Sequence, residues 1–388
     1  MVAKNILRVI YAPNKVFQEV TQNPRYLGPV ILLIIFLIAQ VGVSYLAASR
    51  SYVEQTLPAG DQADAWTEKA ALWQANPEVT VRNNTADYIN GSFYYGGTSI
   101  EFETSNASNV WMELTNLDGS VNCGADGFKN VSFRVKFLTP DAKPENVSFY
   151  LYSLGSSSFY YDLTQIFSNS NVGVWNNITL PVGSEDWVTS GGNANWENVT
   201  GLKMEFTWST NSSINLRIDG LFFRGVFKSA ADIGGVAYIP DFVISAFSQF
   251  GIQWFLLTGI MYVTIKGLKG TTTWKPLMVA VGFSMVIVVI QTLIILATYT
   301  ALPNIWYTLE AVSGVPGEAN MAVENILNSI ALFLQVGFFL KIAVYLWLSM
   351  LCSLIVRVVT SFSWSKSLIV FAISFGLQFL LYLFGILV

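Results

Sequence analysis

Long apolar stretches lie towards both ends of this chain, and the region between them alternates between apolar and polar positions. The apolar stretches cover residues 29–48, 242–265, 276–300, 327–356 and 367–388. Each is close to the roughly 20 apolar residues that a helix needs to cross the hydrocarbon core of a bilayer. The pattern therefore predicts about five transmembrane helices.

The region between the first two stretches contains short runs in which apolar and polar residues alternate. These runs are 98–104, 109–115, 130–138, 146–153, 158–163, 174–180, 202–208 and 214–224. In the third run, Val131, Phe133 and Val135 share one side of the strand, because strand side chains point alternately to opposite faces. Ser132 and Arg134 fall on the other side, which we expect to face solvent. Such a series predicts an all-β sandwich or jelly roll.

The order of these patterns divides the chain into segments. We expect a cytoplasmic amphipathic segment at 1–28, a first transmembrane helix at 29–48, a helical stalk or linker at 49–78, a β-sandwich at 79–228, a linker at 229–241 and a four-helix transmembrane bundle at 242–388. The fold class is a multi-domain membrane protein, in which an α-helical bundle carries an extracytoplasmic, jelly-roll-like β-sandwich.

Lysine and arginine mark the side of the membrane on which each connection lies. They precede the first apolar stretch and follow the second and fourth, whereas the connection 301–326 contains neither. Cytoplasmic loops are enriched in these residues, so the N-terminus should be cytoplasmic, and residues 49–241 and the C-terminus extracytoplasmic, in a multi-pass plasma-membrane protein. The alternative is a signal peptide cleaved near Ala48. A retained anchor is favoured because the apolar core is long and 28 residues precede it.

Acceptor triplets for N-glycosylation fall in the segment that the charge pattern places outside. They begin at Asn83, Asn90, Asn106, Asn130, Asn146, Asn177, Asn198 and Asn211. Several have a β-branched residue in the middle, so that a glycan would leave the solvent face of a strand while the middle residue packs inward. The alternative is that a region rich in Asn, Ser and Thr contains such triplets by chance.

The amino-acid composition limits the reactions and partners that we expect for this chain. The chain has no histidine, which excludes His-based acid–base and nucleophile pairs. Charged residues make up 12% of the chain and the net charge is −4, so nothing favours a nucleic-acid partner. Cys123 and Cys352 lie in different kinds of segment, and we expect no disulfide between them. We expect no enzymatic activity and no catalytic residues, because the carboxylate pairs at 101/103 and 185/186 are typical of solvated surfaces.

The runs FKNVSFRVKF, VGVWNNITLPVGSEDW, WENVTGLKMEFTW and INLRIDGLFF resemble galactose-binding-like jelly rolls and related carbohydrate-binding modules, with Trp175 and Asp219 as matching positions. The resemblance implies a ligand-binding fold, and some members hold a structural Ca²⁺. Asp87, Glu101 and Asp219 are the candidate ligands, because Ca²⁺ prefers oxygen. Alternatively, these carboxylates are solvated or cap turns. No other cofactor is expected.

Two tryptophans in a loop rich in Gly, Ser and Asn, Trp187 and Trp196, are candidates to stack on sugar rings. Packing in the core or in a turn is the alternative, and it is the plainer interpretation for Trp175, Trp196 and Trp208.

The N-terminal stretch resembles the Yip domain (Ypt-interacting protein) family of integral membrane proteins. Pro13, Phe17, Pro24 and Pro29 carry the match, which covers residues 8–48 and extends to 242–388 by hydropathy alone. A large inserted domain departs from that family, so its role in vesicle traffic is not carried over. The insertion and its acceptors look more like an archaeal cell-surface protein.

Polar residues interrupt the apolar stretches. They are Gln40, Gln253, Gln291, Gln335, Gln378 and Lys341. Glutamines in transmembrane helices commonly form interhelical hydrogen bonds. Lys341 would mark a polar cavity or ion path, or else be packed against Gln or backbone carbonyls, or extend to the interface from a shifted helix.

These patterns lead to one principal hypothesis and one alternative. The first is a non-enzymatic integral membrane glycoprotein that displays a carbohydrate- or ligand-binding-like sandwich at the cell surface. Its partners would be membrane lipid, N-linked glycans, and a surface polysaccharide or another membrane protein. The alternative is a transporter or channel component whose outer domain is a cap or receptor.

Overall fold

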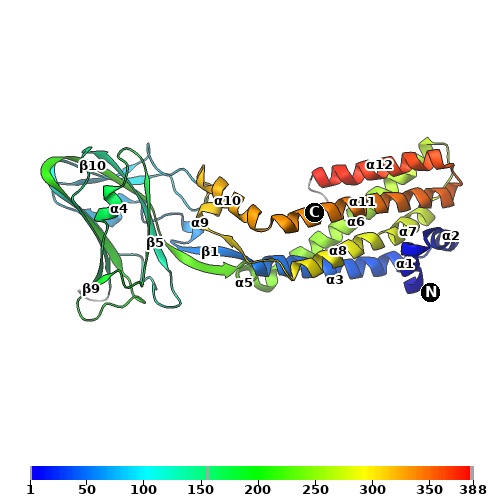
Figure 1. The fold of residues 1–388 in the computed structure, drawn as a ribbon, viewed down its shortest axis with the longest axis horizontal. Helices are drawn as coiled ribbons and strands as arrows, with labels where there is room; N and C mark the ends of the chain where they lie inside the picture. Colours follow the sequence, from blue (N-terminus) through cyan, green and yellow to red (C-terminus); the bar gives the residue numbers. More distant parts are fainter. Residues whose placement is uncertain (1, 154–156, 385–388) are drawn as a thin grey trace. The chain divides into compact units, whose positions relative to one another are not determined.

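The computed structural model describes residues 2–153 and 157–384. The chain forms two compact units. The helical unit comprises Met1–Tyr52, Ser229–Ile305 and Leu327–Val388, and the sandwich unit comprises Val53–Lys228 and Trp306–Ile326 (Figure 1). Each unit is therefore assembled from segments that lie far apart in the sequence.

Helices make up almost all of the helical unit. They are α1 Val2–Tyr11, α2 Pro13–Gln22, α3 Leu27–Arg50, α5 Ala230–Gly234, α6 Tyr238–Gly267, α7 Trp274–Ser284, α8 Val286–Tyr299, α11 Ala331–Thr360 and α12 Trp364–Leu383. Within the described residues, five helical stretches are long and apolar enough to cross a membrane: Leu27–Arg50, Ala230–Gly267, Trp274–Tyr299, Ala331–Thr360 and Trp364–Leu383. Helices therefore cover most of the described part of all five predicted stretches, and residues 385–388 of the last stretch lie outside the described residues.

The N-terminal helices pack onto the rest of the helical unit through their apolar side chains. Val16, Phe17 and Val20 of α2 are buried in the apolar core of the helical unit. The predicted linker 229–241 is wrong in its last four residues, because α6 begins at Tyr238 and continues without a break into the second apolar stretch. Pro240 falls in the first turn of this helix, where a missing N–H costs nothing.

Strands are the main regular elements of the sandwich unit. They are β1 Ser51–Leu57, β2 Trp73–Ala75, β3 Thr80–Asn84, β4 Ser99–Leu114, β5 Asn130–Thr139, β6 Asn146–Tyr152, β7 Ser158–Asp162, β8 Asn176–Pro181, β9 Val188–Ser190, β10 Gly201–Ser229 and β11 Ile305–Tyr307. One short helix, α4 Thr164–Ser168, follows β7. Four predicted runs do not end where we expected: 98–104 joins 109–115 in β4, and 202–208 joins 214–224 in β10.

The two long strands run through both layers of the sandwich. One layer has the order β2, second half of β4, first half of β10, β6, β7, β9. The other has the order β3, first half of β4, remainder of β10, β5, β8. The register of β4 on β10 shifts between Thr207 and Ile214, as expected where a strand bends from one layer into the next.

Inward-pointing side chains of the two layers form one apolar core. Phe133 of β5 stacks on Phe149 of β6 with ring centroids 5.2 Å apart, although these strands are not hydrogen-bonded neighbours. Full burial of a phenylalanine contributes about 1.5–3 kcal/mol. Residues 130–138 form the predicted strand, but the prediction of a solvated face is wrong, because Ser132 and Arg134 on that face are buried.

The stalk or linker predicted at 49–78 is wrong as a helix. Its ends are the strands β1 and β2, and only short 3-10 turns lie between them, at Gly60–Gln62 and Ala70–Leu72. Within this segment, the Trp73 indole N–H donates to the Trp66 carbonyl over 2.7 Å. At the two ends of this segment, pairing with neighbouring strands outweighs the local preference for a helix.

The connection between α8 and α11 also belongs to the sandwich unit. It contains α9 Leu309–Val312 and most of α10 Glu318–Ser329. Leu309 is buried in a small apolar cluster with Ile89, Tyr95 and Phe222. The sequence pattern marked this segment only as a loop between two transmembrane helices.

Candidate functional site

Four aromatic side chains lie on the outer face of one layer of the sandwich. They are Trp111 of β4, Tyr150 and Tyr152 of β6, and Tyr160 of β7, and all four are half-buried. Their neighbours along each strand, such as Met112 and Phe149, point into the core. We call these four residues, together with Glu113, Lys203 and Glu205, the aromatic face.

Strand register brings the members of the aromatic face together. Lys203 of β10 lies opposite Glu113 on one side and opposite Tyr150 on the other. Tyr150 in turn lies opposite Tyr160, and the two rings have centroids 5.3 Å apart. Directly opposed residues in adjacent strands interact as pairs. The face is therefore a continuous row across four strands.

The polar groups of this face are held in place by one another. The Lys203 ammonium lies 5.4 Å from the centroid of the Trp111 ring and 5.8 Å from that of Tyr150. It also pairs with Glu205 at 3.2 Å, and the Asn109 amide donates to the Glu205 carboxylate over 3.0 Å. Burial and the adjacent Glu113 carboxylate raise the pKa of the Tyr152 hydroxyl, so it remains a donor at any ordinary pH.

The tryptophans predicted as a sugar platform lie elsewhere. Trp187 is 6% exposed, and its indole N–H donates to the Pro181 carbonyl over 2.7 Å. Trp196 stacks on Phe159 with ring centroids 3.6 Å apart. Trp187 therefore packs in the core, and the half-buried Trp196 packs against it. Trp111 and the three tyrosines were missed because alternating positions within a strand do not show which face stays open.

Two of the three predicted metal ligands lie in a network of ion pairs. Asp87 pairs with Lys136 and Arg217, and Glu101 pairs with Arg82 and Arg217. Burial would raise the pKa of both carboxyls, but the bonds to these cations outweigh it and hold both below their ordinary values. Because cations already neutralise them, Asp87 and Glu101 are not free to share a metal with Asp219, and the predicted ligand set is wrong in these two members.

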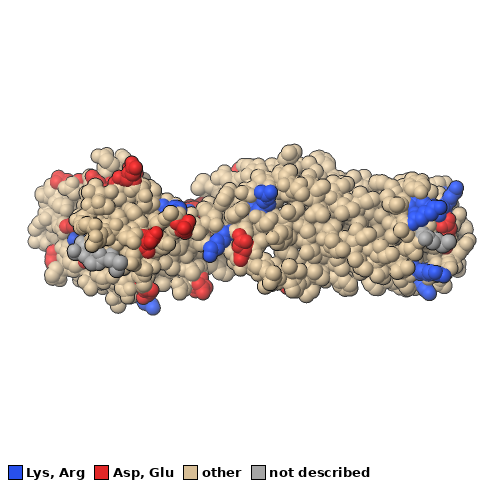
Figure 2. Space-filling view, turned by 90° about the horizontal axis from the view of Figure 1, so that it is seen from below, with Lys and Arg blue, Asp and Glu red and all other residues tan. Residues whose placement is uncertain are grey.

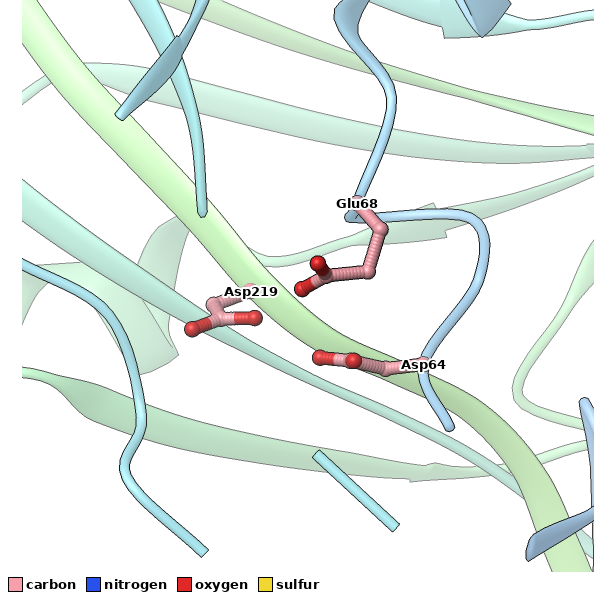
Figure 3. A group of neighbouring side chains, drawn as sticks. All are labelled: Asp64, Glu68 and Asp219. Carbon is pink, nitrogen blue, oxygen red and sulfur yellow. The ribbon is translucent and has the colours of Figure 1, made fainter. Parts of the chain in front are cut away.

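Asp219 belongs instead to a group of three carboxylates that we call the acidic triad: Asp64, Glu68 and Asp219. Each offers an oxygen within 4.8 Å of the others. Figure 3 shows the three carboxylates turned toward one another, with Asp219 on β10 and the other two on the segment that joins β1 to β2. Within the described part of the chain, none of the three forms an ion pair.

Backbone amides fix the orientation of the acidic triad. Gly96 donates to Asp64 over 2.7 Å, Ile89 donates to Asp219 over 2.6 Å, and Gly97 donates to Glu68 over 3.1 Å. Asp64 and Asp219 are buried, whereas Glu68 is half-buried. Burial and then the neighbouring Asp64 carboxylate raise the pKa of Asp219 well above its ordinary value. The arrangement can hold either a shared proton or a cation.

The donor set of the acidic triad fits Ca²⁺, which binds carboxylate and carbonyl oxygens at about 2.3–2.6 Å and therefore joins oxygens several ångströms apart. Asp219 was expected from the sequence. Asp64 and Glu68 were missed because the segment containing them was interpreted as a helix or linker, which gave no reason to place it beside the last strand. The only local signal was two acids four residues apart in DAWTE.

The glycosylation acceptors lie at the surface of the sandwich unit. Six are exposed: Asn83, Asn90, Asn106, Asn146, Asn177 and Asn211. Asn130 and Asn198 are half-buried. The Asn83 amide donates to the Glu68 carbonyl over 2.6 Å, so a glycan there would displace a hydrogen bond next to the acidic triad.

The predicted intramembrane polar residues fall into three groups. Gln40, Gln253, Gln291 and Lys341 line one cavity of the helical unit. Gln378 is buried and donates to the Ser349 hydroxyl over 2.8 Å, which is the interhelical bond that we expected. Gln335 lies exposed on the surface of α11.

Comparisons with known proteins concern the sandwich. A scan against protein-family models and a search of curated proteins both give no match, so the resemblance to Yip domain proteins stays a prediction. Among solved structures, the chain is similar to a family 11 carbohydrate-binding module from Clostridium thermocellum in complex with a β-1,3-1,4-mixed-linked tetrasaccharide, at 13% identity over 44% of this chain and 94% of that one, with a TM-score of 0.29.

Two further solved structures are similar over the same share of the chain. One is a family 30 carbohydrate-binding module of a cellulosomal cellulase of Clostridium thermocellum, at 12% identity over 41% of this chain and 91% of that one, with a TM-score of 0.30. The other is an exo-β-agarase, at 7% identity over 42% of this chain and 24% of that one, with a TM-score of 0.31. The identities and TM-scores are low, so we derive the function from the side chains of this chain.

Proposed function

We propose that this chain is a non-enzymatic, multi-pass membrane protein whose sandwich unit binds a carbohydrate chain outside the cell. The aromatic face is the observation that carries the proposal. A row of half-exposed rings offers apolar surface to the C–H faces of successive sugars, and the polar groups between the rings bind hydroxyls. Recognition sites commonly combine aromatic walls with a few fixed polar groups in this way.

The spacing of the face suits an extended ligand. Neighbouring strands are about 4.8 Å apart, so rings on β4, β6 and β7 follow one another across the layer. Glu113 and Glu205 supply acceptors for hydroxyl groups, and Lys203 supplies a donor. Tyrosine and tryptophan present large area at low conformational cost, and both favour half-buried positions with one polar end.

Binding without turnover is supported by the state of the carboxylates on this face. Glu205 is engaged by Lys203 and by Asn109, and Glu113 lies against the Tyr152 hydroxyl. A glycosidase needs one carboxyl free to donate a proton and a second free to attack or to activate water. These two glutamates are better placed to orient a ligand than to react with it.

A structural Ca²⁺ at the acidic triad completes the proposal. The cation would join the segment between β1 and β2 to β10, and would offset the mutual repulsion of three carboxylates that share no counter-charge in the part of the chain described. Its role would be to hold the sandwich together, since the triad and the aromatic face lie on different parts of β10.

The basic residues and the acceptors support the orientation. Figure 2 shows basic side chains gathered at the end of the helical unit that contains α1 and α2, which favours that end as cytoplasmic. In a glycosylating host, the exposed Asn106 and Asn146 should then carry glycans that a glycosidase removes with a shift in gel mobility. The variant Asn146→Gln should lose one such step, and an unglycosylated protein would place the sandwich on the cytoplasmic side.

The binding proposal is tested with the full chain in detergent on a broad glycan array, followed by titration of the best ligand. We expect Trp111→Ala and Tyr150→Ala each to weaken binding about tenfold or more, because truncating an aromatic anchor costs about 2 kcal/mol. Phe93→Ala is the matched control, since Phe93 is 84% exposed and outside the face. No binding across the array, or equal binding by all variants, would contradict the proposal.

A further inference from the structure

A cavity of about 280 Å³ lies inside the helical unit. Its lining residues come from α3, α6, α8, α11 and α12, so most of the bundle contributes to it. The apolar part of the lining includes Phe36, Val288 and Leu340. The polar part includes Gln253, Gln291 and Lys341.

The two buried glutamines in this lining have unused hydrogen-bonding groups. Gln253 is 3% exposed and Gln291 is 8% exposed. Neither side-chain amide has a hydrogen-bond partner among the residues that the structure describes. Each amide brings two donors and a carbonyl acceptor, and buried polar groups of this kind are normally satisfied. These two amides therefore leave hydrogen-bond donors and acceptors available to a polar occupant of the cavity.

Lys341 indicates the charge of a molecule that binds in the cavity. Its ammonium lies 4.4 Å from the centroid of the Tyr382 ring, and within the described residues it forms no ion pair. The residues that line the cavity include no Asp and no Glu. An ammonium among apolar helices is costly unless a counter-charge meets it. The missing counter-charge is an anion.

The depth of Lys341 indicates where the anion comes from. Lys341 lies 19 residues before Thr360, the end of α11 that turns into α12, which is roughly 28 Å at 1.5 Å per residue. A hydrocarbon core is about 30 Å thick. The ammonium is therefore near the far edge of the core, at the level of lipid headgroups, and Tyr382 at the far end of α12 lies at the same level.

The apolar lining continues to the outside of the bundle. Leu334, Val336 and Phe338 line the cavity and are also exposed on the surface of α11. Because α11 is one of the helices able to span a membrane, this surface is the one offered to acyl chains. The cavity thus joins a cationic, amide-lined interior to a lipid-facing wall.

We propose that this cavity binds an anionic lipid, with its phosphate or carboxylate headgroup on Lys341 and on the amides of Gln253 and Gln291, and its acyl chain along Leu334, Val336 and Phe338. This site is independent of carbohydrate binding by the sandwich unit. It accounts for an unpaired cation and two unpaired amides with one ligand.

The test measures thermal unfolding of the full chain in detergent as phosphatidylglycerol is added, with phosphatidylcholine of the same acyl chains and inorganic phosphate as separate arms. We expect phosphatidylglycerol alone to raise the midpoint, because a ligand that binds only the folded state stabilises it. Lys341→Gln should weaken this effect at least tenfold in lipid concentration, and Lys341→Arg should largely restore it. Lys366→Gln, which removes a cation that bonds the Leu268 carbonyl outside the cavity, is the matched control and should behave as the wild type.

Gln253→Leu separates binding from stability. Without lipid it should unfold at an equal or higher temperature than the wild type, because an apolar side chain replaces an unsatisfied amide, while its response to phosphatidylglycerol becomes weaker. Equal responses to both phospholipids, or an unchanged response of Lys341→Gln, would overturn the proposal. Full stabilisation by inorganic phosphate, or anion flux into proteoliposomes that Lys341→Gln abolishes, would replace the lipid by a free or transported anion.

Discussion

The two units of this protein treat buried polar groups in different ways. In the sandwich unit, buried charges are matched: Arg224 bonds Glu54 and Glu310, and Arg134 bonds Glu318 at 2.6 Å. In the helical unit, the buried polar groups are mainly hydroxyls and amides. The half-buried Lys341 lies over the Tyr382 ring and forms no ion pair among the described residues. Pairing of buried charges is therefore the common arrangement in the sandwich unit, and the charged groups that lack a partner are the informative ones.

One exception stands out in each unit among the described residues. The acidic triad of the sandwich unit has anions without cations, and the cavity of the helical unit has a cation without an anion. The unpaired charge is negative in the sandwich unit and positive in the helical unit. Each therefore indicates a ligand of the opposite charge. Three kinds of experiment test this contrast between the units: removal of a matched partner, supply of a missing one, and titration of a matched one.

The largest effect is expected from removing a matched partner. Arg224→Ala leaves Glu54 buried without its cation, and breaking a buried pair on one side costs about 3–5 kcal/mol. The free energy of unfolding of the sandwich unit, measured by denaturant titration of tryptophan fluorescence, should fall by this amount. Arg82→Ala is the control, because Arg82 is largely exposed and Glu101 keeps Arg217, and it should cost about 1 kcal/mol or less. Equal losses would show that matching contributes little.

A smaller effect is expected from supplying a missing partner. Ca²⁺ at a hundred times its dissociation constant should stabilise the sandwich unit by about 2.7 kcal/mol. Asp219→Asn should abolish this gain, whereas the exposed Asp61→Asn should retain it. Lowering the pH should weaken Ca²⁺ binding, because the raised pKa of Asp219 lets a proton compete. If Ca²⁺ still stabilises the Asp219→Asn variant, the cation does not bind at the acidic triad.

The smallest of these effects is expected from titrating a matched partner. Burial would raise the pKa of Glu310, but the hydrogen bond and charge of Arg224 outweigh it and lower that pKa to about 2. A carboxyl whose pKa falls on folding stabilises the fold above its unfolded pKa, and this contribution disappears as the pH falls through the folded value. Unfolding titrations should show a loss of about 2 kcal/mol between pH 5 and 2 that is absent in Glu310→Gln. An equal loss of stability in the wild type and in Glu310→Gln would show that other carboxyls cause it. Asp219 is not among them, because a carboxyl whose pKa is raised on folding makes the fold more stable as the pH falls.

Much of the architecture could be predicted because burial imposes a period on the sequence. Residues 130–137 alternate strictly and lie within β5, and helices cover most of the described part of each apolar stretch. The long strands could not be predicted, because the polar residues at 105–108 and 209–213 resemble turns, whereas they lie where β4 and β10 bend between layers.

The sites were harder to predict because each depends on segments that are distant in sequence. Asp219 was identified, but its partners Asp64 and Glu68 come from a segment that local patterns made helical. Lys341 was recognised as a polar residue within an apolar stretch, whereas its surroundings depend on how α3, α6, α8 and α12 pack beside α11. Packing of the second layer likewise determines which face of a strand remains exposed, as it does at Trp111.

The division of the sandwich unit between two stretches of chain has a consequence for biosynthesis. Residues 53–228 leave the ribosome first, but Glu310 and Glu318, which bond Arg224 and Arg134, follow only after α6, α7 and α8 have been made. The sandwich therefore cannot reach its final form until two more apolar segments have been translated. Folding of the sandwich unit is therefore completed only after these apolar segments have been synthesised. A nascent chain halted before residue 306 would contain a sandwich unit that lacks residues 306–326.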